Sequence, residues 1–137
     1  MHDLKHSDTT GKIIKAFYKV YNTLGYGFLE KVYENALAIE LREMGLNVSQ
    51  QQPIKVYYGG NLVGSYFADL IIEGCVILEL KAAEAVCEAH EAQLLNYLKA
   101  TEIEVGMLLN FGLKPEYKRK IFTNDRKDFG RVLIDHG

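Results

Sequence analysis

The sequence is poor in the features that mark zinc sites, disulfide frameworks and membrane proteins. Its two cysteines, Cys75 and Cys87, lie twelve positions apart without a second pair, so we interpret both as reduced packing residues. No apolar run reaches the length of a membrane span, and the opening "MHDLKHSDTT" lacks the continuous apolar segment of a signal peptide. We therefore expect a cytoplasmic protein with no membrane partner.

A strong excess of one charge is also missing. The formal net charge is −2, so the chain has no global basic field to attract nucleic acid, and such a contact needs a local patch. Apolar residues make up 48% and charged residues 25% of the chain, as in ordinary globular proteins. Repeats and low-complexity tracts are absent, and 137 residues suffice for one core but not for two domains of usual size. We expect a single domain over residues 1–137.

Three segments repeat apolar residues at helical spacing. The first covers residues 10–24 and ends at the two glycines of "LGYG". The second runs from about Phe28 to Met44, and Gly45 lies where a C-terminal cap is expected. The third covers about Cys87 to Ala100. These patterns predict three helices, two of them before any strand.

The segments between and after the last two helices read as strands. "IKVYYGGNLVGSYFADLII" carries a Gly-Gly-Asn turn between two extended runs, and "EGC" turns into "VILELKA", which predicts a three-stranded antiparallel meander. "VGMLLNFG" predicts a buried strand and "YKRKIFTN" an edge strand, whereas "DFGRVLID" fits either a turn of helix or a strand. Pro53 and Pro115 are placed at element boundaries. The order α-α-β-β-β-α-β-(β) predicts a mixed α/β domain with a sheet between helices.

Ionisable residues interrupt two of the strands that otherwise read as core. Side chains alternate along a strand, so Ile77, Glu79 and Lys81 share one face, and Asp69 lies among apolar neighbours on the preceding strand. An unpaired charge in a core is too costly to persist. These groups must therefore pair with one another, reach water or hold a metal.

The length of the turn decides whether the two acids converge. A two-residue loop would set Asp69 opposite Leu78, on the face away from Glu79, whereas a three-residue loop of Glu73, Gly74 and Cys75 pairs Asp69 with Glu79. Gly74 permits the longer loop because such loops use a residue with positive φ. We predict the three-residue loop or an equivalent bulge.

Two converging carboxylates repel each other unless a cation lies between them. Mg²⁺ or Mn²⁺ prefers oxygen ligands and keeps several waters, so Asp69, Glu79 and the backbone carbonyl of Leu80 make an incomplete shell with open positions. Such a site can activate water against a phosphodiester, with Lys81 orienting the water or stabilising the developing charge. The alternative is a buried ion pair between Lys81 and one of the acids, without chemistry.

At these residues the sequence resembles the PD-(D/E)XK nuclease superfamily, marked by an Asp on one strand and Glu-x-Lys on the next. Ala68 stands where the motif name expects Pro. "GFLEKVY" also matches the signature of the GxxExxY protein family, with Gly27, Glu30 and Tyr33 in the signature positions. The resemblance implies an α/β (α+β) fold with a restriction-endonuclease-like αβββαβ core, a mixed sheet flanked by helices and an extra N-terminal helix. It implies a Mg²⁺- or Mn²⁺-dependent nuclease that hydrolyses DNA.

The resemblance also implies roles for residues on the second and third predicted helices. Glu30 would be a helix acid near the metal, and Tyr33 would lie beside it, although a tyrosine on an apolar helix face is more often core. Gln93 and Tyr97 are similar to the QxxxY element of exonuclease-type members, which would let Gln93 hold the lysine, a water or a phosphate. His90 lies on roughly the same face and is a candidate contact to DNA.

The final quarter of the chain gathers basic residues between aromatic ones. Candidates for phosphate contacts are Lys118, Arg119, Lys120, Arg126 and Lys127. Alternatively, they solubilise an edge strand. Two other functions compete with a nuclease: a catalytically silent nucleic-acid-binding module of the same fold, or a small regulatory subunit with a structural ion pair. Pairing of two copies to reach both DNA strands is a further expectation.

Overall fold

The computed structural model of the chain describes residues 5–127. Its helices and strands, in chain order, are α1 Ser7–Leu24, α2 Glu30–Glu43, β1 Val48–Tyr58, β2 Asn61–Ile72, β3 Val76–Lys81, α3 Glu88–Lys99, β4 Val105–Phe111 and β5 Pro115–Ile121, followed by a short 3-10 helix, η1, at Asn124–Arg126. The predicted order of elements is confirmed through β5. The prediction for "DFGRVLID" lies outside the described residues.

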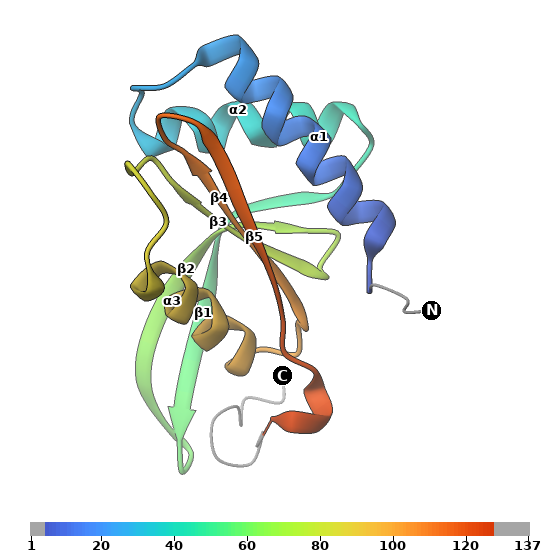
Figure 1. Cartoon of the computed structure of the whole chain (residues 1–137). Helices are drawn as coiled ribbons and strands as arrows, with labels where there is room; N and C mark the ends of the chain where they lie inside the picture. The colour runs from blue at the N-terminus through green and yellow to red at the C-terminus, as the bar shows by residue number, and fades with distance from the viewer. Residues whose placement is uncertain (1–4, 128–137) are drawn as a thin grey trace.

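The five strands form one sheet in the order β1-β2-β3-β4-β5. Strands β3 and β4 are parallel and all other neighbours are antiparallel, so the sheet is mixed. Helix α3 connects the parallel pair, as a parallel connection requires. Figure 1 shows α1 and α2 on one side of the sheet and α3 on the other. This is the α/β arrangement with helices on both faces that the sequence predicts, and it is consistent with a restriction-endonuclease-like core.

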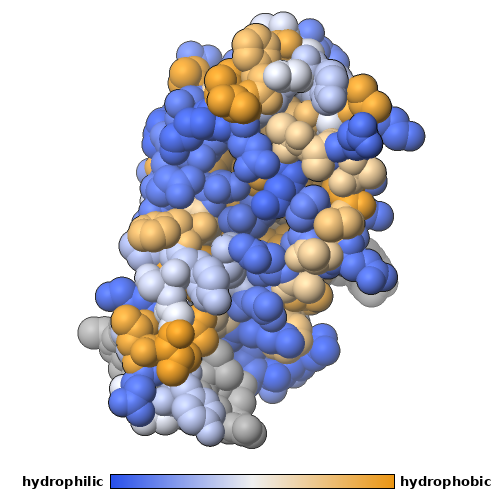
Figure 2. Space-filling view, turned by 90° about the vertical axis from the view of Figure 1, so that its left-hand side faces the viewer, coloured by the Kyte–Doolittle hydropathy of each residue, from blue (hydrophilic) through white to orange (hydrophobic). Residues whose placement is uncertain are grey.

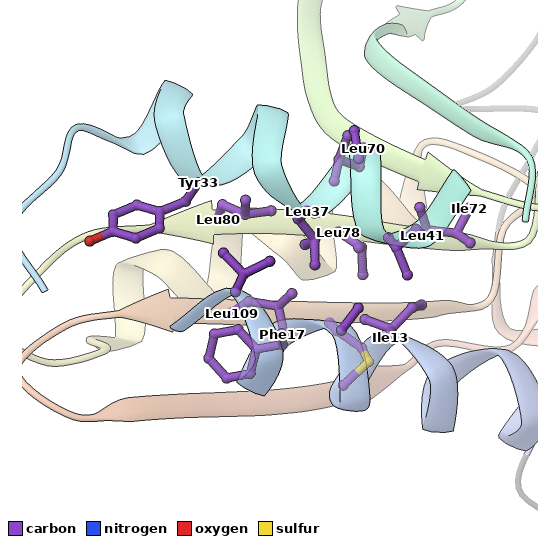
Figure 3. Close-up of a cluster of buried hydrophobic side chains, with 14 of the residues drawn as sticks. Ile13, Phe17, Tyr33, Leu37, Leu41, Leu70, Ile72, Leu78, Leu80 and Leu109 are labelled. Carbon is purple, nitrogen blue, oxygen red and sulfur yellow. The ribbon is translucent and has the colours of Figure 1, made fainter. Parts of the chain in front are cut away.

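Two separate cores follow from the alternation of side chains along β3. Val76, Leu78 and Leu80 point into the core under α1 and α2, whereas Ile77 belongs to the core under α3. In the first core, Figure 3 shows leucines of α2 over Leu78 and Leu80, and Phe17 of α1 beside Leu109 of β4. The alternation therefore sends Glu79 and Lys81 toward the α3 side, away from the larger core.

Strands β1 and β2 continue as a two-stranded ribbon beyond the end of β3 (Figure 1). Pro53 lies inside β1, paired with Phe67, so its predicted place at an element boundary is wrong; Pro115 does begin β5. A proline fits within β1 because β1 is an edge strand, where a missing N–H can face away from the ladder.

The cysteines differ in their surroundings. Both are free; Cys75 packs against the larger core, whereas Cys87 is exposed, so the predicted packing role is wrong for Cys87. Cys87 instead precedes the first turn of α3. Within residues 5–127, no helix combines the length and the apolar character that crossing a bilayer requires.

Candidate metal centre

The turn between β2 and β3 sets the geometry of the candidate site. Leu70 pairs with Leu78 and Ile72 with Val76, which leaves a three-residue loop of Glu73, Gly74 and Cys75. Glu73 and Gly74 adopt positive φ values of 55° and 65°. The predicted odd loop is confirmed, and its register places Asp69 directly opposite Glu79.

The backbone ladder between β2 and β3 stops at Leu70 and Leu78, and carboxylates replace it beyond that point. The Asp69 N–H donates to Glu79 Oε2 at 3.0 Å, and the Leu80 N–H donates to Asp69 Oδ2 at 2.8 Å. Each acid therefore satisfies a backbone donor of the opposite strand. The exchange holds both carboxylates where the two strands separate.

Both acids are disfavoured as anions in the absence of a cation. Glu79 is only 5% exposed, and burial, followed by the charge of Asp69, raises its pKa to about 8. Burial also raises the pKa of Asp69, and the charges of Glu34 and Glu30 on α2 add to the effect. A divalent cation between the two side chains would offset the cost of burying their charges and cancel their mutual repulsion.

Lys81 lies near the acids without bonding to either. Its charge lowers the pKa of Glu79, but among residues 5–127 Lys81 forms no ion pair within 4 Å with Asp69 or Glu79. The alternative of a buried ion pair is therefore not what the structure shows. The ammonium group remains available to another anion.

The chain after Lys81 is fixed by an asparagine that sequence reasoning missed. Asn110 of β4 pairs with Lys81, is fully buried and bonds the N–H and the carbonyl of Ala83 through its side chain, both at 3.0 Å. A polar residue within the buried strand "VGMLLNFG" was the available signal. Asn110 thus positions the backbone that follows Lys81.

Two further residues connect α2 to the acids: Glu34, which helical spacing places on one face with Glu30 and Tyr33, and Gln51 of β1, which sequence reasoning missed. Glu34 is 4% exposed and accepts bonds from Gln50 Nε2 at 2.8 Å and from Gln51 Nε2 at 2.9 Å. Gln51 Nε2 also lies 3.3 Å from Asp69 Oδ1, so it bridges two carboxylates. Gln51 has a positive φ of 53°, which is unusual for a residue with a side chain and occurs at functional sites. The signal in the sequence was "SQQQP", a polar run within a strand.

The signature residues of α2 have different surroundings. Glu30 is exposed at the first turn, close enough for its charge to raise the pKa of Asp69 and Glu79. Tyr33 is fully buried, stacks on Phe111 with ring centroids 4.3 Å apart, donates to the Gly25 carbonyl at 2.5 Å and accepts from the Phe28 N–H at 3.1 Å. Tyr33 therefore fixes the loop that leads into Glu30 and is itself a core residue.

Helix α3 carries the remaining predicted site residues. Gln93 Nε2 donates to Tyr97 Oη at 2.7 Å, so the predicted pairing of these two residues on one helix face is confirmed. Burial raises the pKa of Tyr97, and the charge of Glu79 raises it further. The Gln93–Tyr97 pair is therefore close enough to the acids to interact with their charge. His90 accepts a weak bond from the Cys87 N–H at 3.4 Å through Nδ1, so it caps α3; its contact to DNA stays a prediction.

Most of the basic candidates in the final quarter of the chain are engaged internally. Lys120 pairs with Glu91 at 2.6 Å, Arg119 donates to the Lys5 carbonyl at 2.6 Å, and Arg126 lies 4.6 Å from the ring centre of Phe122. Lys127 donates to the carbonyls of Thr101 and Ile103 at 2.9 and 2.8 Å. Lys118 is exposed on β5. Their contacts to nucleic acid stay predictions; Lys118 and Arg126 are the two whose side chains are exposed.

The donor set fits a hard divalent cation that keeps part of its water shell. Asp69 and Glu79 supply carboxylate oxygens at one point, and Mg²⁺ is commonly held by one or two carboxylates plus water and phosphate oxygens. In the described part of the chain, no group of three His, Cys, Asp or Glu side chains could hold a metal ion. Glu30 is therefore not gathered with Asp69 and Glu79 into such a group, and the Leu80 carbonyl stays the predicted third ligand.

The profile of the PD-(D/E)XK nuclease superfamily matches residues 7–120. No curated protein matches the sequence. Among solved structures, the chain is similar to the crystal structure of SSO0001, with a TM-score of 0.52 and 19% identity. That similarity covers 85% of this chain and 59% of the other, and at this identity it shows a shared fold alone.

Proposed function

Because the chain belongs to the PD-(D/E)XK nuclease superfamily, we propose that it is a Mg²⁺- or Mn²⁺-dependent nuclease that hydrolyses phosphodiester bonds of DNA. The observation that supports the proposal best is the exchange of hydrogen bonds between the Asp69 and Glu79 strands, which brings a half-buried and a buried carboxylate together without a protein cation bonded to either. Proteins of this superfamily typically use a divalent metal. The raised pKa values of both acids are those expected of carboxylates that a bound cation would stabilise as anions.

Each residue of the site has a separate task in this proposal. Asp69, Glu79 and the Leu80 carbonyl would hold the ion, and Glu30 would reach it through water from the start of α2. The bound ion would supply an activated water and neutralise charge on the phosphate. Lys81 would orient that water or bind a phosphate oxygen, because no carboxylate of the site holds its ammonium group. Gln93, donating to Tyr97, would position a phosphate or the lysine.

We also infer membership of the narrower GxxExxY family. In support, the three signature residues act as one unit: Gly27 has a φ of 117°, Tyr33 bonds both sides of this glycine loop, and Glu30 begins the helix that follows. A glycine is needed at such a φ because other residues rarely adopt it. The spacing thus positions an acid at a defined helix start.

Cleavage of plasmid and of single-stranded DNA in Mg²⁺ or Mn²⁺ tests the proposal. The wild type should cut, Asp69→Asn and Lys81→Met should each lose at least about 100-fold in rate, and EDTA should stop the reaction. Lys12→Met serves as a matched control, because it removes an exposed lysine of α1, on the side of the sheet opposite to α3. Equal cutting by wild type, Asp69→Asn and Lys81→Met would reject the proposal and indicate a contaminant. Binding without product would favour the silent module instead.

A further inference from the structure

A pocket lies between the β1–β2 ribbon and α3, beside the candidate metal centre. Its volume is about 250 Å³, and its lining includes Tyr66 of β2 and Tyr97, Asn96 and Gln93 of α3. Tyr97 packs in the same core as Ile77, which lies two residues before Glu79 on one face of β3, so the pocket and the acids are neighbours. Drug-sized ligands usually occupy about 300–1,000 Å³, so this pocket suits a smaller planar group.

The pocket combines flat apolar surfaces with polar groups at its rim. The Tyr66 ring is 46% exposed and lies 5.7 Å from the Tyr97 ring, centre to centre, while Tyr97 and Ala100 form a buried floor. Asn96 and Gln93 supply amide donors and acceptors, and Lys99 supplies one cation. A nucleobase needs these chemistries: a ring to stack on and amides for its polar edge.

A second hollow, of about 390 Å³, lies on the other side of the motif. It is lined by Tyr26, Phe28 and Glu30 of the loop and helix before the sheet, and by Ala82, which directly follows Lys81. The rings of Tyr26 and Phe28 are 52% and 47% exposed. Exposed aromatic rings thus border the site on both sides, whereas most of the basic candidates of the chain are engaged in internal contacts. Figure 2 shows this side of the molecule as a broad hydrophilic band with apolar groups toward both ends.

We propose that the Tyr66–Tyr97 pocket binds an unpaired nucleobase next to the scissile phosphate, so that the substrate is single-stranded or locally unpaired DNA. The choice of DNA rests on the proposed function. Bases in an intact duplex are stacked on each other and cannot enter a side pocket without being extruded. Single strands expose their bases, and stacking on aromatic side chains binds them with little dependence on sequence.

Binding without cleavage tests the pocket independently of catalysis. Fluorescence anisotropy in EDTA would use a labelled oligothymidylate, an abasic oligomer with the same number of phosphates, and a hairpin of equal charge whose fully paired stem is closed by a loop without bases. The wild type should bind the oligothymidylate about tenfold or more tightly than the abasic oligomer, the effect of about one base stack. The hairpin should bind no better than the abasic oligomer.

Substitutions of Tyr66 test whether the preference for oligothymidylate arises in this pocket. Tyr66→Ala should weaken oligothymidylate binding about tenfold and leave abasic binding unchanged, whereas Tyr66→Phe should retain both because the ring is kept. Tyr58→Ala removes a 69% exposed tyrosine at the ribbon tip and should bind like wild type. Melting temperatures close to wild type confirm that each variant is folded.

Each result decides for or against the pocket. Equal binding of thymidylate and abasic oligomers, preference for the hairpin, no effect of Tyr66→Ala, or absence of any binding by the wild type would overturn it. Asp69→Asn should keep the oligothymidylate preference while losing cleavage. A failure of cleavage alone therefore rejects the proposed nuclease, and a failure of base-dependent binding alone rejects the pocket.

Discussion

Asp69 and Glu79 face each other across the point where β2 and β3 separate, and each carboxylate accepts an N–H from the opposite strand. The bonds replace the ladder that ends at Leu70 and Leu78. The two acids are therefore fixed by backbone donors before any ion arrives. An ion would bind a geometry that is already formed, without the cost of ordering its ligands.

Glu79 should make the metal-free protein less stable as the pH rises. Its pKa is about 8 in the folded protein against an ordinary value of 4.5, so between these values the folded chain keeps a proton that the unfolded chain has lost. The stability from this group is fully present below pH 4.5 and is lost as the pH rises through 8. Glu79→Gln removes the titration and should raise the melting temperature in EDTA at alkaline pH more than at acidic pH. Glu43→Gln, at an exposed acid whose charge does not act on Glu79, is the control; equal slopes in wild type and Glu79→Gln would contradict the expectation.

Manganese uptake should release protons and strengthen with pH. The ion binds carboxylates, so it must displace the proton that Glu79 holds up to a pH of about 8. The increase in melting temperature caused by Mn²⁺ should therefore grow from acidic to mildly alkaline pH. The increase should vanish in Glu79→Gln and Asp69→Asn. Calorimetry in two buffers of different ionisation enthalpy would count the released protons; a pH-independent affinity would refute the coupling.

Lys81→Met should change stability little while removing cleavage. Breaking a buried ion pair costs about 3–5 kcal/mol, because it leaves an unpaired charge, whereas removing an unpaired lysine costs about 0.5 kcal/mol or less. Lys81 forms no ion pair with Asp69 or Glu79 among the described residues. Urea unfolding of wild type and variant distinguishes the two cases. A loss of several kcal/mol would restore the structural ion pair as the explanation of this motif.

The convergence of Asp69 and Glu79 was predictable because it depends on local rules. Alternation along a strand and the length of one turn fix which face each side chain takes, and Gly74 signalled that turn. The order of elements followed in the same way from periodicity. The local expectation failed for Pro53, because whether a strand lies at a sheet edge depends on the whole topology.

The contacts of Glu34 and Gln51 were not predictable from their positions. They join α2 to β1, and Gln51, which contacts Asp69, has a left-handed backbone conformation that breaks the regular alternation of the strand. Neither a helical period nor a strand alternation encodes such a residue. The sequence likewise could not predict that Lys120 and Arg119 form contacts within the protein, because their partners Glu91 and Lys5 lie far away in sequence.

Tyr33→Phe should separate the two tasks of this buried residue. Phenylalanine keeps the stack on Phe111 but loses the bonds to the Gly25 carbonyl and the Phe28 N–H, at a cost of about 1–2 kcal/mol. The loosened loop should also lower cleavage by displacing Glu30. Tyr21→Phe is a matched control, since its hydroxyl bonds the carbonyls of Gly112 and Leu113 away from that loop. If both variants lose equal stability and only Tyr33→Phe loses cleavage, the signature tyrosine acts by positioning the helix acid; equal cleavage in both would reject this.

The basic residues of the final quarter should divide into a structural and a binding group. The Lys127 ammonium donates to the carbonyls of Thr101 and Ile103, and burial lowers its pKa, so Lys127→Ala should cost about 1–2 kcal/mol of stability. Lys118 is exposed on β5, so Lys118→Ala should leave stability within about 0.5 kcal/mol of wild type.

If Lys118 contacts a phosphate, its loss should weaken binding of all sequences alike and reduce the salt slope by about one. Binding titrations at several salt concentrations measure that slope. An unchanged slope in Lys118→Ala would mean that this lysine only solubilises the edge strand, because a released counterion is what a phosphate contact must produce.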